Sequence, residues 1–465
     1  RGSDPLRASR PSQLGNVDAH RRVIGPRPLR VELVKLRSFG GLTAEPSGLN
    51  VPAWESTVAS ALGSGNYLPV GMGRSYGDVA LSSGAVAVSS LELNRFLGFN
   101  PDTGVLICEP GVLLRDIQAT FVKLGWVLHV TPGTSFVSVG GAIANDIHGK
   151  DHHLAGTFGD HVLAFTLVRS DGQVLECSPT SNQGFFRATI GGLGLTGFIT
   201  SATLQLKKVA GPYFDTEVIP YNSLSEFFEL SDQTESDNWQ ASVSWFDCST
   251  AKAGRGSFTR GNVAERAYDE TTEPKGLGLS VPFTPPISLI NKLTLDVFNT
   301  GYFQLQKAGA GKRQMHYREF YYPLDGVRNW NRIYGPKGFF QYQSVVPMEH
   351  AAAATEEMLA VIRKSGQGSF LAVLKTFADR EPAGLLSFAR HGVTLALDFP
   401  NRGEKTEGLM QKLDSIVLEA GGALNPSKDA RMSREAFSAG FPGLTEFKKY
   451  RDPGAVSNFS RRVID

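Results

Sequence analysis

Twelve residues from Ala142 to His153, AIANDIHGKDHH, hold three of the nine histidines of the chain together with a lysine. His148 and His152 have a spacing that two zinc ligands use on one face of a helix. Gly149 interrupts this spacing and further glycines flank it, so a continuous helix is not expected. We therefore predict no metal site. Two alternatives stay open: these histidines satisfy buried hydrogen bonds, or they form the wall of a cofactor pocket.

Two glycine-rich loops have the composition of such a pocket. PVGMGRSYGD, residues 69–78, follows an apolar strand, and its backbone N–H groups can form a nest for phosphate oxygens. TPGTSFVSVGG, residues 131–141, lets the backbone approach a flat or anionic ligand and adds hydroxyl groups. Either loop alone could be a plain surface turn. Together they indicate a cofactor pocket.

A third glycine-rich stretch, GLGLTG at residues 192–197, satisfies the dinucleotide-binding pattern G-x-G-x-x-G. That pattern needs a helix after it, because the pyrophosphate lies at the helix N-terminus. The residues after Gly197 are β-branched and alternate in polarity, which is typical of a strand. We interpret the stretch as a turn close to a ligand and not as a Rossmann motif.

Two parts of the chain with different predicted secondary structure must position these loops. Residues 67–208 are predicted to form short strands, with hairpins around residues 100–104 and 171–172 and a strand in GFITSATLQLKKV. Between the hairpins, Leu113, Ile117, Phe121 and Leu124 have helical spacing and are expected to face the core.

Residues 209–420 have a different composition. An apolar, Pro- and Gly-rich segment at 273–298 is followed by a strand at 339–347, a helix at 349–366, strands at 369–377 and 392–400, and a helix at 405–422. This order indicates an α+β module around one sheet. Residues 423–465 are too few for a core of their own and must pack on another unit.

The composition narrows the function classes. The 47 basic and 45 acidic residues leave a formal charge of +2, so nucleic acid is not expected as the main partner. Three widely spaced cysteines argue against a disulfide framework and favour a reducing compartment. The sequence contains no run of about twenty apolar residues, the length that a membrane-spanning helix needs. Residues 1–24 are expected to be a disordered leader or a cloning remnant.

Several motifs, in this order, resemble one family of flavoenzymes. GMGRSYGD, PGTSFVSVGGAIANDIHGKDHH and GGLGLTGFI are similar to the FAD-binding domain of the vanillyl-alcohol oxidase and p-cresol methylhydroxylase (PCMH) type. Further along, FYYPLD, QYQSVVP, SFLAVLKTF, LALDFP and YRDPGAVSNFSRRV resemble the branch of that family that oxidises decaprenylphosphoryl-β-D-ribose in a 2-epimerase. The resemblance covers about residues 67–465.

The resemblance implies an α+β fold in which a two-part PCMH-type FAD-binding domain is interrupted by an α+β substrate-binding domain. The FAD-binding domain would comprise residues 25–208, the substrate domain residues 209–420, and residues 421–465 would complete the FAD-binding domain. FAD is expected to be bound non-covalently. The location implied is cytoplasmic, with peripheral contact at the inner membrane as an open possibility.

The implied reaction is oxidation of the 2-hydroxyl of a polyprenyl-phosphoryl pentofuranose, with hydride passing to the flavin. A partner NAD(P)H-dependent keto-sugar reductase would then complete a ribo-to-arabino inversion. The apolar segment from Pro274 to Phe298 favours a lipid-linked substrate, because it could cover a polyprenyl chain. Two alternatives remain: an alditol or aldonolactone oxidase acting on a soluble sugar, and a flavin-free binding or scaffold protein.

The resemblance also assigns roles to individual residues. The chain departs from the branch at Thr394, Ala396 and Asn425, where relatives carry asparagine, cysteine and tyrosine, so the exact sugar is open. The expected catalytic residues are Lys428, Tyr76, His148 and Lys150, and the expected substrate-binding residues are Tyr321, Gln341, Gln343, Lys375 and Thr394. The expected FAD-binding residues are Gly71, Gly73, Arg74, Ser75, Tyr76, Gly77, Pro132, Gly133, Thr134, Val137, Ser138, Gly140, Gly141, Asn145, Ile147, His148, Gly194 and Ile199.

Overall fold

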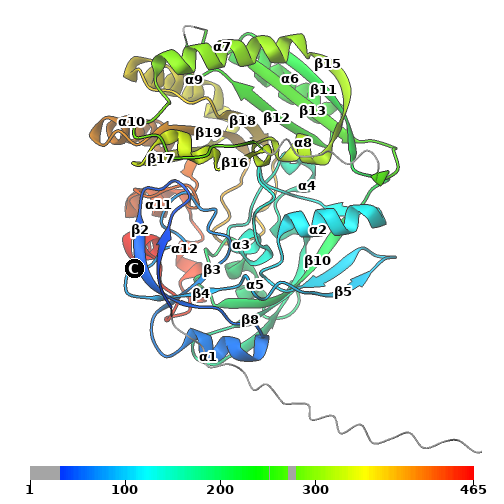
Figure 1. The fold of residues 1–465 in the computed structure, drawn as a ribbon, viewed down its shortest axis with the longest axis vertical. Helices are drawn as coiled ribbons and strands as arrows, with labels where there is room; N and C mark the ends of the chain where they lie inside the picture. Colours follow the sequence, from blue (N-terminus) through cyan, green and yellow to red (C-terminus); the bar gives the residue numbers. More distant parts are fainter. Residues whose placement is uncertain (1–31, 251, 271–278) are drawn as a thin grey trace, which may run out of the picture.

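The structure is a computed structural model that describes residues 32–250, 252–270 and 279–465. The chain is arranged in two layers (Figure 1). The lower layer contains the first ten strands and the C-terminal helices, and the upper layer contains one large sheet with its helices. The expected leader, residues 1–24, lies outside the described residues.

Two sheets form the lower layer. One has the order β1-β2-β4-β3, with an antiparallel β1–β2 pair and parallel pairs on both sides of β4; its strands are β1 Glu32–Arg37, β2 Ala44–Asn50, β4 Val86–Ser89 and β3 Tyr67–Val70. The other is antiparallel, has the order β5-β6-β10-β8-β9 and carries β7 on β10; its strands are β5 Phe96–Asn100, β6 Val105–Cys108, β10 Phe198–Lys208, β8 Val162–Val168, β9 Val174–Cys177 and β7 Trp126–Leu128.

The two predicted hairpins are confirmed as β5–β6 and β8–β9. The strand predicted after GLGLTG is β10, so the stretch does not lead into a helix. The helix predicted between the hairpins is α2, Leu114–Phe121, and Ile117 and Phe121 are buried in the core. Leu124 was expected to face the core but is exposed, because the chain turns through a short 3-10 helix before Gly125.

The upper layer is an antiparallel sheet in the order β15-β11-β13-β12-β18-β19-β17-β20. The predicted strands at 339–347, 369–377 and 392–400 are confirmed as β17, β18 and β19, which are neighbours in this sheet. The remaining strands were not predicted. The strands are β15 Gly311–His316, β11 Tyr213–Tyr221, β13 Gly256–Val263, β12 Ala241–Phe246, β18 Ala372–Phe377, β19 Gly392–Pro400, β17 Phe339–Val346 and β20 Ala423–Leu424.

Helices cover both faces of this sheet. One face packs against α6 Leu224–Ser236, α9 Met348–Ser365 and α10 Glu404–Glu419 in the largest hydrophobic core. On the other face, α7, Lys292–Ala308, contacts Trp245 of β12 through Tyr302. Helix α7 was not predicted, because residues 274–298 were interpreted as an apolar segment that could cover a polyprenyl chain. Part of that segment, residues 274–278, lies outside the described residues.

The C-terminal segment returns to the lower layer (Figure 1, orange to red). Its helices are α11 Arg434–Gly440, α12 Leu444–Phe447 and α13 Asn458–Val463. The Tyr67 hydroxyl donates to Asp452 at 3.0 Å, and Arg462 pairs with Asp78 at 2.8 Å. As expected for a segment without a core of its own, its apolar side chains join cores built by other parts of the chain.

Candidate active site

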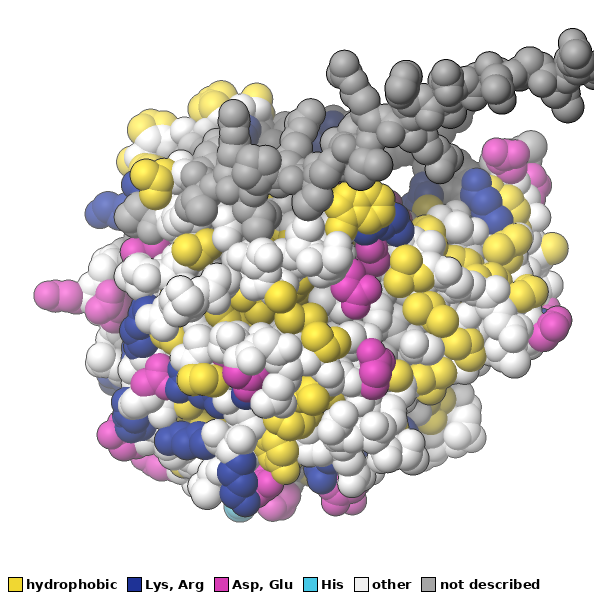
Figure 2. Space-filling view, turned by 90° about the horizontal axis from the view of Figure 1, so that it is seen from below, with side chains coloured by type: hydrophobic (Ala, Val, Ile, Leu, Met, Phe, Trp, Pro, Cys, Tyr) yellow, Lys and Arg dark blue, Asp and Glu magenta, His cyan; other side chains and the backbone are white. Residues whose placement is uncertain are grey.

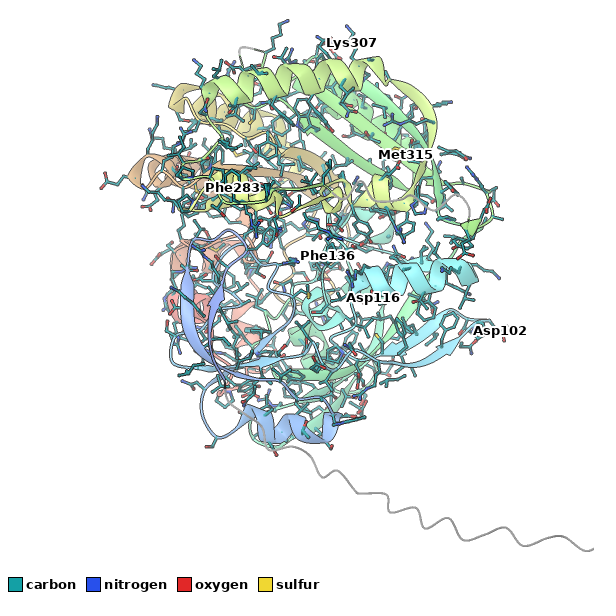
Figure 3. All side chains as sticks on the ribbon, in the orientation of Figure 1. Asp102, Asp116, Phe136, Phe283, Lys307 and Met315 are labelled. Atoms are coloured by element: carbon teal, nitrogen blue, oxygen red, sulfur yellow. The ribbon has the colours of Figure 1, made fainter. Side chains whose placement is uncertain are left out.

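A cavity of about 1410 Å³ lies between the loops of the lower layer and the open face of the large sheet. Typical single-ligand pockets measure about 300–1,000 Å³, so this one has room for more than one ligand. Figure 3 shows Phe136, which lines the cavity, at the level where the two layers meet.

Most of the residues singled out from the sequence line this one cavity. Two do not. Gly77 packs against the C-terminal segment, where an added Cβ would lie 1.6 Å from the carbonyl oxygen of Asp429. Thr394 is buried behind the cavity wall. Those that line it are Gly71, Gly73, Arg74, Ser75, Tyr76, Pro132, Gly133, Thr134, Val137, Ser138, Gly140, Gly141, Asn145, Ile147, His148, Lys150, Gly194, Ile199, Tyr321, Gln341, Gln343, Lys375 and Lys428.

The lower wall consists mainly of backbone. At Gly71 a Cβ would lie 2.2 Å from the Ser138 hydroxyl, which caps α3, Val139–Ala144, by accepting from the Gly141 N–H. At Gly133 a Cβ would meet nothing within 4 Å, since this backbone borders open space. Asn145 lines the cavity, and its Oδ1 is buried without a hydrogen-bond partner. Close backbone approach and an unpaired buried acceptor fit the polar, flat outline of FAD.

One loop differs from the expectation. Thr134 and Ser135 were expected to offer free hydroxyls to the cofactor. Instead, both donate to Asp325, at 2.6 Å and 2.7 Å, and the Ser135 N–H donates to the same carboxylate at 2.8 Å. Asp325 follows β15 and the short helix α8, Tyr317–Tyr321, so these bonds fasten the lower loop to the upper layer. Thr134 still borders the cavity, but its hydroxyl is already engaged.

His148 lies half-buried where the two layers meet. Its Nε2 lies 3.1 Å from the side-chain nitrogen of Gln343, and its Nδ1 lies 3.3 Å from the Nζ of Lys375. Phe377 contacts the ring edge-on at 4.8 Å. Burial, reinforced by the charge of Lys375, lowers the pKa of His148 well below its ordinary value, so this imidazole is neutral at physiological pH.

Two lysines flank this histidine. Lys375 projects from β18, donates to the Gly149 carbonyl at 3.0 Å, and burial lowers its pKa to about 7, with Lys150 contributing repulsion. Lys150 donates to the Phe320 carbonyl, and burial lowers its pKa to about 8. A lysine with a pKa near 7 is neutral in a large fraction of molecules at physiological pH, which is the state that accepts a proton.

A carboxylate not foreseen from the sequence balances this charge. Asp151 is buried and accepts a hydrogen bond from the Tyr321 hydroxyl at 2.8 Å. Its burial raises its pKa to about 6, and the neighbouring lysines oppose that rise. Tyr321 thus reaches the site bound to an acid, and burial beside this acid raises the pKa of Tyr321 well above its ordinary value.

A second group of charged residues lies beside the first glycine-rich loop. The Nζ of Lys428 lies 4.3 Å from the centre of the Tyr76 ring, which is cation–π geometry. Asp398 on β19 accepts from Gln341 at 2.8 Å and from Tyr334 at 3.3 Å. Burial lowers the pKa of Lys428 to about 8 and raises that of Asp398 to about 7, and the two charges favour each other.

The three positions that depart from the family pattern belong to one network. Gln343 donates to the Thr394 hydroxyl at 3.1 Å and accepts from Asn425 at 3.0 Å. Gln343 is also the residue beside His148. Ala396 lies opposite Gln343 across the β17–β19 pair and lines the cavity. The substitutions therefore surround the glutamine that contacts the histidine.

Sequence reasoning missed Asp151, Asp398 and Asp325. Asp151 was within the quoted histidine stretch, and its position next to Lys150 was a usable signal. Asp398, Ala396 and Thr394 occupy every second position of one strand. The hydrogen-bond partners of Asp398 come from β17 and from a 3-10 helix, and one sequence alone does not show that these segments lie beside the strand. Among residues 32–250, 252–270 and 279–465, no group of three or more histidine, cysteine or acidic side chains is arranged to hold a metal ion.

Comparisons with known proteins agree with this geometry. Residues 55–178 match the FAD binding domain family model. The chain is 35% identical over 423 residues, 88% of this chain and 91% of the relative, to the decaprenylphosphoryl-β-D-ribose oxidase of Mycolicibacterium smegmatis. It is 36% identical over 138 residues, 29% of this chain and 30% of the relative, to L-gulonolactone oxidase of Mus musculus.

The long match covers most of both chains, whereas the short one spans less than a third of either chain. With an FAD binding domain and a relative of this identity and coverage, the chain belongs to the decaprenylphosphoryl-β-D-ribose oxidase family of FAD-dependent oxidoreductases.

Proposed function

We propose that this chain oxidises the 2-hydroxyl of a polyprenyl-phosphoryl ribofuranose to the 2-keto sugar, the first half of a ribo-to-arabino epimerisation. The relative's name supplies the substrate class. The observation that carries the proposal is the junction of His148, Lys375 and Gln343, which faces the same cavity as the glycine-rich loops. A hydroxyl placed there meets hydrogen-bonding groups on one side and the flavin-binding wall on the other.

The residues divide the work. Bound FAD supplies the hydride acceptor. Lys375, neutral in a large fraction of molecules because its pKa is about 7, takes the hydroxyl proton. His148 and the Gly149 carbonyl hold its Nζ in place, and Gln343 holds the ring of His148.

Lys428 has a separate role. It lies against Tyr76 of the first glycine-rich loop, so its charge is directed to the flavin side of the cavity. A fixed cation in a buried site stabilises negative charge that develops on the cofactor as it is reduced. The negative charge of Asp398 raises the pKa of Lys428 and so favours its protonated form.

The division into domains follows from this assignment. Residues 25–208 and 421–465 would form a two-part PCMH-type FAD-binding domain, and residues 209–420 the inserted substrate-binding domain. The return of the C-terminal helices to Tyr67 and Asp78 supports this organisation. The chain crosses between the two domains near residue 421, because β20, just after this boundary, still pairs with β17 at the edge of the large sheet.

FAD is held non-covalently in this proposal. His148 is the only histidine among the described residues that line the cavity, and no described cysteine lines it. Both ring nitrogens of His148 lie within hydrogen-bond distance of Gln343 or Lys375. His148 is therefore engaged by its neighbours and is not free to bond to the flavin. Denaturation and filtration should release all yellow colour from the polypeptide; colour that stays with the chain would overturn this assignment.

The product of the reaction is a keto sugar, so the inversion requires a second enzyme that delivers hydride, and we propose an NAD(P)H-dependent reductase as the partner. Because the substrate carries a polyprenyl chain, the enzyme must meet it at a bilayer, which supports peripheral membrane contact. No helix of the described part of the chain is long and apolar enough to cross a membrane.

Anaerobic flavin bleaching tests the function. Polyprenyl-phosphoryl ribose in detergent should reduce the bound FAD within the first turnover, and L-gulonolactone or a free alditol should not. The arabino epimer, which presents the 2-hydroxyl on the other face, is the matched control. Reduction by the soluble sugars alone would replace the proposal with a sugar oxidase of the gulonolactone type.

A further inference from the structure

Helix α7 exposes an apolar arc. Leu293, Val297 and Leu305 are 73%, 67% and 66% exposed, and at 100° per residue they share one side of the helix with Gly301. A surface helix normally turns polar side chains to water and apolar ones to the core. The outer arc of α7 carries no charged residue, and its exposed polar residues are Thr294 and Gln304.

The chain before α7 extends this apolar surface. Phe283, Ile287 and Leu289 are all exposed. The Leu289 N–H donates to the Ile333 carbonyl at 2.9 Å, so the loop is fixed against the structure and its side chains point outward. Figure 3 places Phe283 and Lys307, near opposite ends of this region, in the upper layer. We call the outer arc of α7 and these three loop residues the apolar patch.

The part of the chain that forms the apolar patch is rich in basic residues. Between residues 279 and 316 the chain carries the basic residues Lys292, Lys307, Lys312 and Arg313 but a single acid, Asp296. The face of the lower layer in Figure 2 is different: there apolar side chains are interspersed with both basic and acidic ones. An apolar surface accompanied by basic residues has the chemistry that binds anionic bilayers, where apolar side chains enter the interface and lysines meet phosphate groups.

The apolar patch is continuous with the cavity. Phe298 and Tyr302 stack at 5.7 Å on the side of α7 next to the outer arc, and both line the cavity. Tyr302 also contacts Trp245 on the floor of the large sheet at 4.8 Å. Phe298 and Tyr302, which line the cavity, are therefore the direct sequence neighbours of Val297 and Gly301 on the outer arc.

We infer that the apolar patch is a docking surface for an anionic lipid bilayer, with α7 lying in the membrane interface. Docked in this way, α7 opens the cavity toward the acyl layer, and a polyprenyl chain can pass along Phe298 and Tyr302 without crossing water. The purpose of this surface rests on the proposed lipid-linked substrate, but the docking is measured without any substrate.

Vesicle flotation tests the inference on the FAD-loaded full chain. The wild type should float with vesicles that contain phosphatidylglycerol and less with pure phosphatidylcholine. Leu293→Glu combined with Val297→Glu should lower the partition coefficient on the order of tenfold or more, since it places charge in the interface. The matched control is Leu124→Glu combined with Val174→Glu, two exposed apolar residues of the lower layer, which should float like the wild type.

Three outcomes would overturn the inference: a wild type that stays in solution with both vesicles, a patch variant that floats as well as the control, and a wild type that self-associates through this patch in light scattering. Neither Leu293 nor Val297 lines the cavity, so flavin reduction by a detergent-dispersed substrate should be unchanged in the variant. Failure of that reduction in the wild type would refute the proposed function and leave the docking result standing.

Discussion

The two walls of the cavity bind in different ways. At the lower wall the backbone of Gly71, Gly133 and Gly140 lines the cavity, and an added Cβ at Gly133 would meet only open space. The opposite wall presents partly buried side chains whose pKa values are shifted, above all Lys375 and Lys428. A backbone wall holds a large cofactor in any protonation state. Side chains with shifted pKa values can accept or donate a proton. The chemical step is therefore expected to depend on the opposite wall, and retention of the cofactor on the lower wall.

The largest effect is expected at Lys375. Lys375→Met removes the proposed proton acceptor and should slow flavin reduction about 10²–10⁴-fold, the range for loss of a general base. In the wild type the neutral fraction of Lys375 grows as pH rises, so the rate should increase with pH through about 7, and this step should vanish in Lys375→Met. Rapid mixing under anaerobic conditions measures both.

Lys375→Arg is the control for this position. Arginine keeps the charge but stays protonated, so it cannot accept the proton. Near wild-type reduction by Lys375→Arg would show that Lys375 acts only as a cation.

Lys428 tests the flavin side of the same junction. Lys428→Met should retain FAD, because the lower wall supplies the binding, but should slow flavin reduction on the order of a hundredfold, the scale of one preorganised electrostatic group. Lys412→Met, an exposed lysine on α10, is the matched control. A Lys428→Met protein that stays yellow and is reduced at the wild-type rate would remove this lysine from the mechanism.

The sequence predicted the lower wall better than the upper one. Glycine spacing in residues 69–78 and 131–141 reports directly on backbone approach, and those loops do meet at the cavity. Pairing between distant strands decides which side chains meet on the upper wall. Asp398 was therefore missed, although it is two residues from Ala396 on the same strand. Lys375 was identified because a lysine within an apolar strand is costly to bury without a partner.

Helix α7 was missed for a related physical reason. Sequence periodicity finds a helix when its apolar side faces the core and its polar side faces water. In α7 the buried side includes Asn299, and the exposed side is apolar, so the expected contrast is absent. Gly77 belongs to the first glycine-rich loop but does not line the cavity, and its lack of a side chain allows the close contact with Asp429.

Two glycines can separate packing from cofactor binding in the lower wall. Gly77→Ala drives a methyl group into the Asp429 backbone and should lower the free energy of unfolding by about 1–3 kcal/mol. Gly133→Ala places its methyl in open cavity space, so the apoprotein should unfold as the wild type does, while FAD affinity falls on the order of tenfold, about 1.4 kcal/mol. Thermal unfolding of apoprotein and flavin titration measure the two effects, and the reverse pattern would contradict the assignment.

The smallest effect is expected behind the upper wall, at Thr394. This residue does not line the cavity, but its hydroxyl accepts from Gln343, the partner of His148. Thr394→Val keeps the shape and leaves a buried donor of Gln343 without its acceptor, at a cost of about 1–3 kcal/mol. Only part of that cost reaches the reaction, through a misplaced histidine, so flavin reduction should slow several-fold while the unfolding temperature falls. Thr394→Ser restores the hydroxyl and should recover the rate; if it does not, the methyl contact and not the hydrogen bond positions Gln343, and the two walls are coupled through packing.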